Sequence, residues 1–166
     1  MNGPILSIIT VNFNNNLGLL KTLESVSSQS FSSYEHIIID AGSTDGSRET
    51  IIQYEKENPH LSFWSSEPDK GIYDGMNKGI DHAKGQYLYF LNSGDCLSQD
   101  ILAKIPFDGT EYLYGDTILF YKRKTKKRVY PDTLDLIYLS DNSLHHQSCF
   151  IHHTLFKDKR YDINYK

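Results

Sequence analysis

Oxygen-bearing side chains follow three apolar, strand-length runs of this sequence, close to the point where each run ends. The three groups are Thr10 and Asn14, Asp40 and Ser43, and Asn92, Ser93 and Asp95. In an open parallel sheet, ligands bind in the crevice beyond the carboxyl ends of the strands, where residues distant in sequence converge. The sequence therefore predicts one polar site built from all three groups.

What the sequence lacks limits the chemistry of such a site. No G-x-G-x-x-G or G-x-x-x-x-G-K-[ST] occurs, which argues against hydride transfer with a dinucleotide and against P-loop hydrolysis. Without a glycine cradle or a dense cation cluster, a bound diphosphate needs a bridging divalent cation, and such cations prefer oxygen ligands such as the Asp95 carboxylate. Asp40 is an acceptor for the imide hydrogen of uracil or for a ribose hydroxyl, and Phe13 can cover a base.

The same positions also have plainer interpretations. Asp40 can cap the helix that follows it, and spacing alone gives capping and ligand binding about even weight. Asp45 lies beside Gly46 at a predicted helix start, and for this residue a helix cap is favoured roughly two to one over a ligand contact. An isolated Asn92-Ser93-Gly94-Asp95 is typical of a plain turn, but its place after a buried strand reverses that preference.

The elements that position these residues alternate between strands and helices. Apolar runs predict strands at 5–11, 36–40, 61–64 and 87–91, and helical spacing predicts helices at 19–26, 47–57 and 72–80, the last ended by Gly85. This order predicts an α/β fold, with a Rossmann-like, mostly parallel sheet flanked by helices and joined by right-handed crossovers.

The pattern changes after Pro106. Glu111–Tyr121 and Lys126–Tyr130 are typical of two strands around a basic tip, and a short helix is predicted near Leu134–Leu139. We interpret this part as a β-hairpin layer added to a single domain of residues 1–166. For the basic run Lys122–Arg128, a solvated tip is favoured roughly two to one over contact with anionic lipid or a phosphate-linked acceptor.

The composition is that of an ordinary globular domain. With 17 basic and 21 acidic residues, the formal charge is -4, which offers no general attraction to nucleic acid. Cys96 and Cys149 form neither a CxxC nor a secretory pattern, which favours a reducing compartment. No apolar run approaches the ~20 residues of a membrane span, and the start lacks the basic region of a signal peptide. We expect a cytoplasmic protein, with peripheral contact at the inner face of the membrane as an alternative.

Four segments, in this order and spacing, are similar to one known family. The segments are Ser7–Asn14, Asp40–Ser47, Glu67–Gly79 and Phe90–Asp95. Through them, the chain resembles the family 2 glycosyltransferases of the GT-A fold, especially bacterial members that synthesise cell-surface polysaccharides. The resemblance implies inverting transfer of a sugar from a nucleotide-sugar donor, expected to be UDP-linked, to a saccharide or lipid-linked acceptor.

The resemblance also implies roles for individual residues. Asp95 is expected to coordinate Mg²⁺ or Mn²⁺ on the diphosphate, where the metal stabilises the departing group. The donor site is expected to consist of Thr10, Phe13, Asn14, Asp40, Ser43, Asp69, Lys70 and Ser93. His146 and Gln147 are expected on the acceptor side, so residues 1–105 form the nucleotide-sugar-binding half and residues 106–166 the start of the acceptor-side half.

This chain departs from the family pattern at two places. Many members carry a second acid directly after the position of Asp40, where this chain has Ala41. The earlier acidic positions of the metal motif are occupied by Asn92 and Gly94, which leaves Asp95 as the only carboxylate. Metal binding is therefore expected to depend on the donor.

The catalytic base of the family is a carboxylate downstream of the segment that resembles His146–Ile151. We expect it beyond Lys166, in a chain truncated before that base, so that the chain binds donor but transfers sugar poorly. A non-catalytic nucleotide-sugar-binding fragment is the main alternative. A nucleotidyltransferase is disfavoured because no glycine-rich loop with Arg or Lys follows the first strand.

Overall fold

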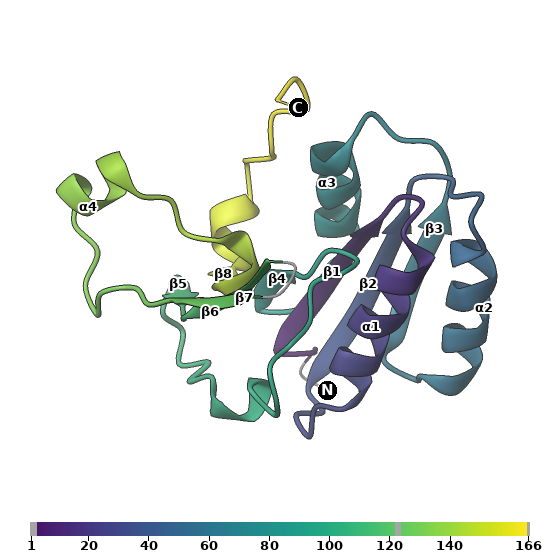
Figure 1. Ribbon diagram of the computed structural model, residues 1–166, viewed down its shortest axis with the longest axis horizontal. Helices are drawn as coiled ribbons and strands as arrows, with labels where there is room; N and C mark the ends of the chain where they lie inside the picture. The colour runs from purple at the N-terminus through teal and green to yellow at the C-terminus, as the bar shows by residue number, and fades with distance from the viewer. Residues whose placement is uncertain (1–2, 122–123, 166) are drawn as a thin grey trace.

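The computed structural model describes residues 3–121 and 124–165, and its centre is a six-stranded sheet with helices packed against it (Figure 1). The first elements are β1 (Leu6–Asn12), α1 (Asn16–Ser27), β2 (Tyr34–Asp40), α2 (Ser47–Glu57), β3 (Leu61–Ser66), α3 (Ile72–His82) and β4 (Tyr87–Phe90). Strands β3, β2, β1 and β4 are parallel neighbours in that order. The predicted α/β fold with a mostly parallel sheet is confirmed.

Helices cover both faces of the parallel strands because β1 and β2 are apolar on both sides. Every residue of these two strands is buried. Successive side chains of a strand point to opposite faces. Ile37 accordingly packs with Met76 of α3, whereas Ile38 packs with Leu19 of α1 and Ile51 of α2. Packing on both faces holds β1 and β2 in place, and with them the carboxyl ends of these strands.

Gly85 lets the chain before β4 approach β1 closely. A Cβ at this position would lie 2.5 Å from the Ser7 backbone nitrogen, a distance that real Cβ atoms do not show. The helix before it ends earlier, at His82, and the Ala83 N–H donates to the Ile80 carbonyl. The prediction that Gly85 ends this helix is therefore wrong, since the glycine serves close packing instead.

The chain after β4 adds antiparallel strands and a separate hairpin. Its elements are η1 (Leu102–Lys104), β5 (Tyr112–Tyr114), β6 (Thr117–Tyr121), β7 (Lys124–Arg128), α4 (Leu136–Asp141), η2 (His146–Ser148), β8 (Cys149–His152) and η3 (His153–Phe156). Strand β8 pairs with β4 on one side and β5 on the other, and β6 pairs with β7. The added hairpin is confirmed. The single strand predicted for Glu111–Tyr121 is wrong, because the chain leaves the main sheet at Gly115.

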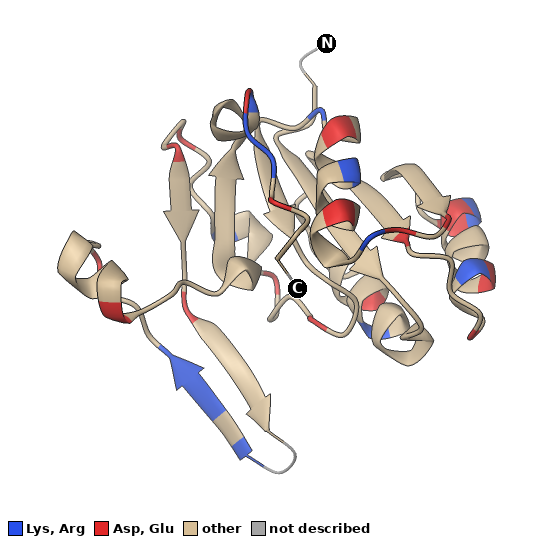
Figure 2. Cartoon of the chain, turned by 90° about the horizontal axis from the view of Figure 1, so that it is seen from above, with Lys and Arg blue, Asp and Glu red and all other residues tan. Residues whose placement is uncertain are grey.

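The hairpin projects from the body of the molecule, and its second strand is cationic (Figure 2). Lys122 and Arg123, at the predicted basic tip, lie outside the described residues. No helix in the described part of the chain is long and apolar enough to cross a membrane.

Candidate functional site

The loops after β1, β2 and β4 meet at the carboxyl edge of the sheet, and we call this place the strand-end site. The Asn14 N–H donates to Ser43 Oγ at 2.8 Å, and Asn15 Nδ2 donates to the Ser93 carbonyl at 2.9 Å. Asn15 Oδ1 also accepts the Gly18 N–H and so caps α1. The first loop therefore contacts both of the others, which is the convergence that the sequence predicted.

Asp40 ends β2 with its side chain completely buried. Its carboxylate accepts hydrogen bonds from Asn12 Nδ2 at 2.7 Å, Ser66 Oγ at 2.6 Å, and Ser43 N and Oγ at 2.9 and 2.5 Å. Burial opposes ionisation, but these hydrogen bonds outweigh it and hold the pKa of the Asp40 carboxyl below its ordinary value. Asp40 neither caps α2 nor presents surface to a ligand here. It orders the loop that follows it.

Asp45 joins the amino ends of two helices. Its Oδ1 accepts the N–H and the hydroxyl of Ser47 at 3.2 and 2.6 Å, and its Oδ2 accepts the Asn16 N–H at 2.7 Å. The hydrogen bond from the Ser47 hydroxyl is the main reason that the pKa of this exposed carboxyl lies below its ordinary value. Asp45 thus satisfies backbone donors at the first residue of both helices, as a capping role requires, although the N-cap position of α2 itself is Gly46.

The turn Asn92–Asp95 is held against α1 by Thr22, a residue that the sequence gave no reason to single out. Thr22 Oγ1 donates to the Asp95 carbonyl at 2.7 Å and accepts the Gly94 N–H at 3.0 Å. Gly94 has a φ of 100°, in the left-handed region that favours glycine. The backbone that carries the Asp95 carboxylate is thus fixed from a neighbouring helix.

The predicted acceptor-side residues lie beside the Asp95 side chain. Gln147 Nε2 donates to Asp95 Oδ2 at 3.0 Å, and His146 Nε2 lies 3.1 Å from Asn92 Nδ2. The Tyr89 hydroxyl donates to the Gln147 carbonyl at 2.8 Å and anchors that segment to β4. Burial lowers the pKa of His146, although the Asp95 charge acts in the opposite direction. At neutral pH a neutral ring therefore stands beside the carboxylate.

Three further predicted donor residues lie in the loop after β1 and in the segment before α3, and they form no hydrogen bond with Asp95 or Asn92. Phe13 is 63% exposed, as a ring that receives a ligand must be. Asp69 Oδ1 accepts the Gly71 N–H at 2.8 Å, but its Oδ2 is buried and has no hydrogen-bond partner among the described residues. Such an unpaired oxygen is costly, so Asp69 is a good candidate for a ligand contact. The Lys70 side chain is exposed.

Thr10 lies inside the sheet, away from the crevice. Its side chain is completely buried, and its hydroxyl donates to the Leu91 carbonyl at 2.8 Å. Thr10 Oγ1 also lies 2.9 Å from His36 Nε2, and His36 Nδ1 lies 3.1 Å from the Tyr54 hydroxyl. In this structure Thr10 supports the end of β4 and offers no surface to a nucleoside.

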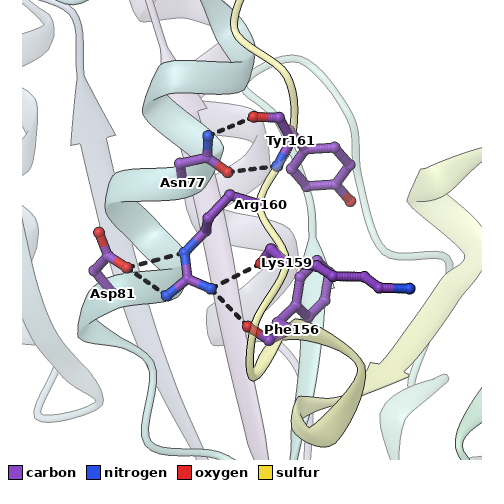
Figure 3. Close-up of polar contacts among 6 residues, drawn as sticks. All are labelled: Asn77, Asp81, Phe156, Lys159, Arg160 and Tyr161. Carbon is purple, nitrogen blue, oxygen red and sulfur yellow. Dashed lines mark hydrogen bonds and ion pairs between the residues drawn. The ribbon is translucent and has the colours of Figure 1, made fainter.

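The segment after η3 is fastened to α3 (Figure 3). The Asn77 amide pairs with the Tyr161 backbone, donating to its carbonyl and accepting its N–H, both at 2.9 Å. Arg160 donates to Asp81 and to the carbonyls of Phe156 and Lys159. These contacts hold the segment after η3 against α3.

The oxygen ligands at Asp95 suit a cation that arrives with a diphosphate. No group of three or more His, Cys, Asp or Glu side chains is arranged to hold a metal ion in the described part of the chain. The turn offers one carboxylate and the buried Asn92 Oδ1, which has no partner among the described residues. Mg²⁺ and Mn²⁺ accept such oxygen ligands and complete their coordination with phosphate oxygens and water. The residues therefore fit a metal shared with substrate.

A cavity of about 460 Å³ lies at the opposite, amino-terminal edge of the sheet. Its walls include Tyr34, Tyr54 and His60, none of which belongs to the strand-end site. The case for the strand-end site therefore rests on converging polar groups and not on this cavity.

Sequence comparison links the chain to sugar-transferring proteins. Residues 7–154 match the family model described as glycosyl transferase family 2. An uncharacterized glycosyltransferase of Mycobacterium tuberculosis is 43% identical over 103 residues, which are 61% of this chain and 38% of that protein. The putative teichuronic acid biosynthesis glycosyltransferase TuaG of Bacillus subtilis is 37% identical over 101 residues, 61% of this chain and 40% of the relative. The chain thus spans less than half the length of these relatives.

Solved structures of glycosyltransferases share the fold. S. aureus TarS matches with a TM-score of 0.70 at 19% identity, over 96% of this chain and 30% of that one. The mannosyltransferase PcManGT from Pyrobaculum calidifontis, in complex with GDP-Man and Mn²⁺, matches with a TM-score of 0.56 at 18% identity, over 61% and 30%. A further structure of TarS, residues 1–349, contains UDP. The fold of the chain is GT-A.

Proposed function

The chain belongs to glycosyl transferase family 2, and from that premise we propose that the strand-end site binds a nucleotide-sugar donor for transfer to a saccharide or lipid-linked acceptor. The observation that carries the proposal is the Asp95 carboxylate, fixed by Gln147 beside His146. A UDP-linked donor and a role in cell-surface polysaccharide synthesis are our first choices. The UDP complex of TarS supports the first choice, and the similarity to TuaG supports the second.

Asp95 is assigned to the metal, as Mg²⁺ or Mn²⁺, with Asn92 Oδ1 as the second candidate ligand. When bound, the cation supplies positive charge that stabilises the departing diphosphate. The Gln147 amide orients the carboxylate by occupying one of its oxygens. The Mn²⁺ in the PcManGT complex supports this assignment.

The nucleoside is assigned to the rim formed by Phe13 and Asp69. The exposed Phe13 ring covers the base, and the unpaired Asp69 oxygen accepts a hydrogen from the base or the ribose. Asn14 and Ser43 shape this rim through their mutual hydrogen bond. Lys70 and Ser93 are assigned to the diphosphate, where a lysine adds a compensating charge.

Asp40 and Thr10 are assigned to support and not to ligand contact. Both side chains are completely buried, and their polar atoms are bonded within the protein. His146 and Gln147 are assigned to the acceptor side, next to the metal ligand. In an inverting transfer, a separate carboxylate takes the acceptor proton as its oxygen attacks the anomeric carbon. Asp95 is not that base.

Thermal unfolding with UDP, GDP and dTDP, each with and without Mn²⁺, tests the proposal. A ligand at about a hundred times its Kd stabilises a protein by about 2.7 kcal/mol. For a domain of this size that corresponds to a rise in Tm of roughly 5–10 °C. We expect the largest rise with UDP and Mn²⁺ together. Asp95→Ala should lose the Mn²⁺-dependent part and keep the part due to nucleotide alone.

The control is Asp158→Ala, which removes an exposed carboxylate remote from the site and should respond like the parent chain. Absence of stabilisation by every nucleotide would disprove the site. So would a full Mn²⁺-dependent rise in Asp95→Ala. Release of free UDP from UDP-sugar separates an enzyme from a module that only binds donor.

A further inference from the structure

The tip of the β6–β7 hairpin combines aromatic and cationic side chains. Phe120 and Tyr121, the last two residues of β6, are 80% and 58% exposed. Lys124 and Lys126, on the returning strand, are exposed and form no ion pair with any described residue. In Figure 2 this hairpin stands clear of the body of the molecule. Tyr121 pairs with Lys124 and so lies on one face of the hairpin with Lys124 and Lys126, whereas Phe120 points to the other face. All four side chains are exposed at the same end of the hairpin, and we call this end the hairpin tip.

The base of the hairpin uses its own cations to hold the hairpin in place. Lys127 Nζ lies 2.8 Å from Asp116 Oδ2, and the other oxygen of Asp116 accepts the Tyr130 N–H at 3.3 Å. Arg128 Nη2 donates to Asn142 Oδ1 at 3.0 Å, just after α4. These contacts fix the base to the rest of the chain. Lys124 and Lys126 form no such ion pair with the described residues, so their charges are available to a partner.

A two-stranded sheet buries little of its own apolar surface. Strand β6 accordingly exposes Ile118, at 46%, in addition to Phe120 and Tyr121, whereas Thr117 and Leu119 are partly covered. Aromatic side chains next to lysines are typical of segments that enter the boundary between lipid headgroups and acyl chains. A soluble polyanion would satisfy the lysines but would leave the aromatic rings in water.

We propose that the hairpin tip docks on an anionic lipid bilayer. Phe120 and Tyr121 enter the headgroup region, while Lys124 and Lys126 meet the lipid phosphates. The attraction is local, because the whole chain has a formal charge of -4. Docking does not rest on sugar transfer, so each can be tested without the other.

The test is sedimentation of the 166-residue chain with vesicles of phosphatidylcholine alone or mixed with phosphatidylglycerol. We expect binding to the anionic vesicles only, weakening as salt rises. The double variant Lys124→Gln/Lys126→Gln should lower the partition coefficient roughly 30-fold, from about 1 kcal/mol per lysine near the surface. Phe120→Ser keeps the charge and should lower it about tenfold through lost burial of the ring.

Matched controls come from α1 and α2, away from the hairpin. Leu17→Ser removes an apolar side chain that is 77% exposed, and Lys21→Gln/Lys56→Gln removes two exposed lysines. Neither should change the partition coefficient more than twofold. Phe120→Trp adds a reporter to a chain whose only tryptophan is Trp64, and its emission should shift to shorter wavelength with anionic vesicles.

Three results would overturn the proposal. The first is the absence of binding to anionic vesicles at low salt. The second is equal loss of binding in the tip variants and in the controls. The third is binding that Phe120→Ser leaves unchanged and that a soluble polyanion abolishes, because the tip would then recognise charge alone.

Discussion

His36 gives this fold a calculable dependence on pH. The ring is completely buried, and burial lowers its pKa from 6.5 to about 3. Since the Thr10 hydroxyl donates to the Leu91 carbonyl, His36 Nε2 must carry the hydrogen that it shares with Thr10. Nδ1 then accepts from the Tyr54 hydroxyl. A second proton on the ring would face that donor within a completely buried site.

The size of the effect follows from the two pKa values. The unfolded chain takes up a proton near pH 6.5, whereas the folded ring resists protonation until about pH 3. The stability involved is therefore fully present above pH 6.5 and is lost as the pH falls toward 3. At 1.36 kcal/mol per pH unit, the loss is about 2 kcal/mol at about pH 5 and approaches about 5 kcal/mol at about pH 3.

Urea unfolding of the parent chain and of His36→Gln, at about pH 7.5 and about pH 5, measures this term. The other histidines are common to both proteins, so their contributions cancel in the difference. The parent should lose about 2 kcal/mol more than the variant between the two pH values. Equal losses would refute the reasoning. If the variant does not fold, NMR titration of the parent decides, because a ring that protonates above pH 5 contradicts the expectation.

Three further predictions concern packing and accessibility. Asn77→Ala should lower the free energy of unfolding by about 2 kcal/mol, because two partly buried hydrogen bonds are lost, and should speed amide exchange in the segment after η3. Gly79→Ala should cost roughly 1–3 kcal/mol in urea unfolding, because its Cβ would lie 2.4 Å from a buried isoleucine, whereas Gly115→Ala, with open space around it, should cost far less. Iodoacetamide should label exposed Cys96 in the folded chain and buried Cys149 only after unfolding.

The parallel half of the fold was predictable because its signals are local. Runs such as Ile37–Ile39 are apolar on both faces, and the helices between the strands have clear periodicity. The prediction merged the antiparallel strand β5 with β6 into one strand, and it did not include β8. Strands β5 and β8 are three and four residues long, and each is a strand because a neighbour pairs with it. Leu113 pairs with Phe150 only in the folded protein, and the sequence of neither segment predicts that pairing.

The candidate site was predictable as a location but not in its details. The end of each parallel strand follows from the apolar pattern, so the convergence of three loops follows as well. Which side chains face the crevice does not follow, because one residue along a strand reverses the direction of a side chain. Thr10 is thus enclosed, while Phe13, in the loop, is exposed. Thr22 supports the site from the middle of a helix, where no motif marks it.

Asp40 ends β2 and Asp95 lies in the turn after β4, and their neighbours give these two acids different roles. Asp40 is surrounded by amide and hydroxyl donors from the adjacent strand and loops, so its charge is used within the protein. Asp95 receives one side-chain donor, Gln147, and its other oxygen accepts no hydrogen bond from the described residues. Only one carboxylate of the pair is therefore open to a cation. A cation held by one carboxylate gains most of its binding energy from substrate oxygens, so metal and donor should bind cooperatively.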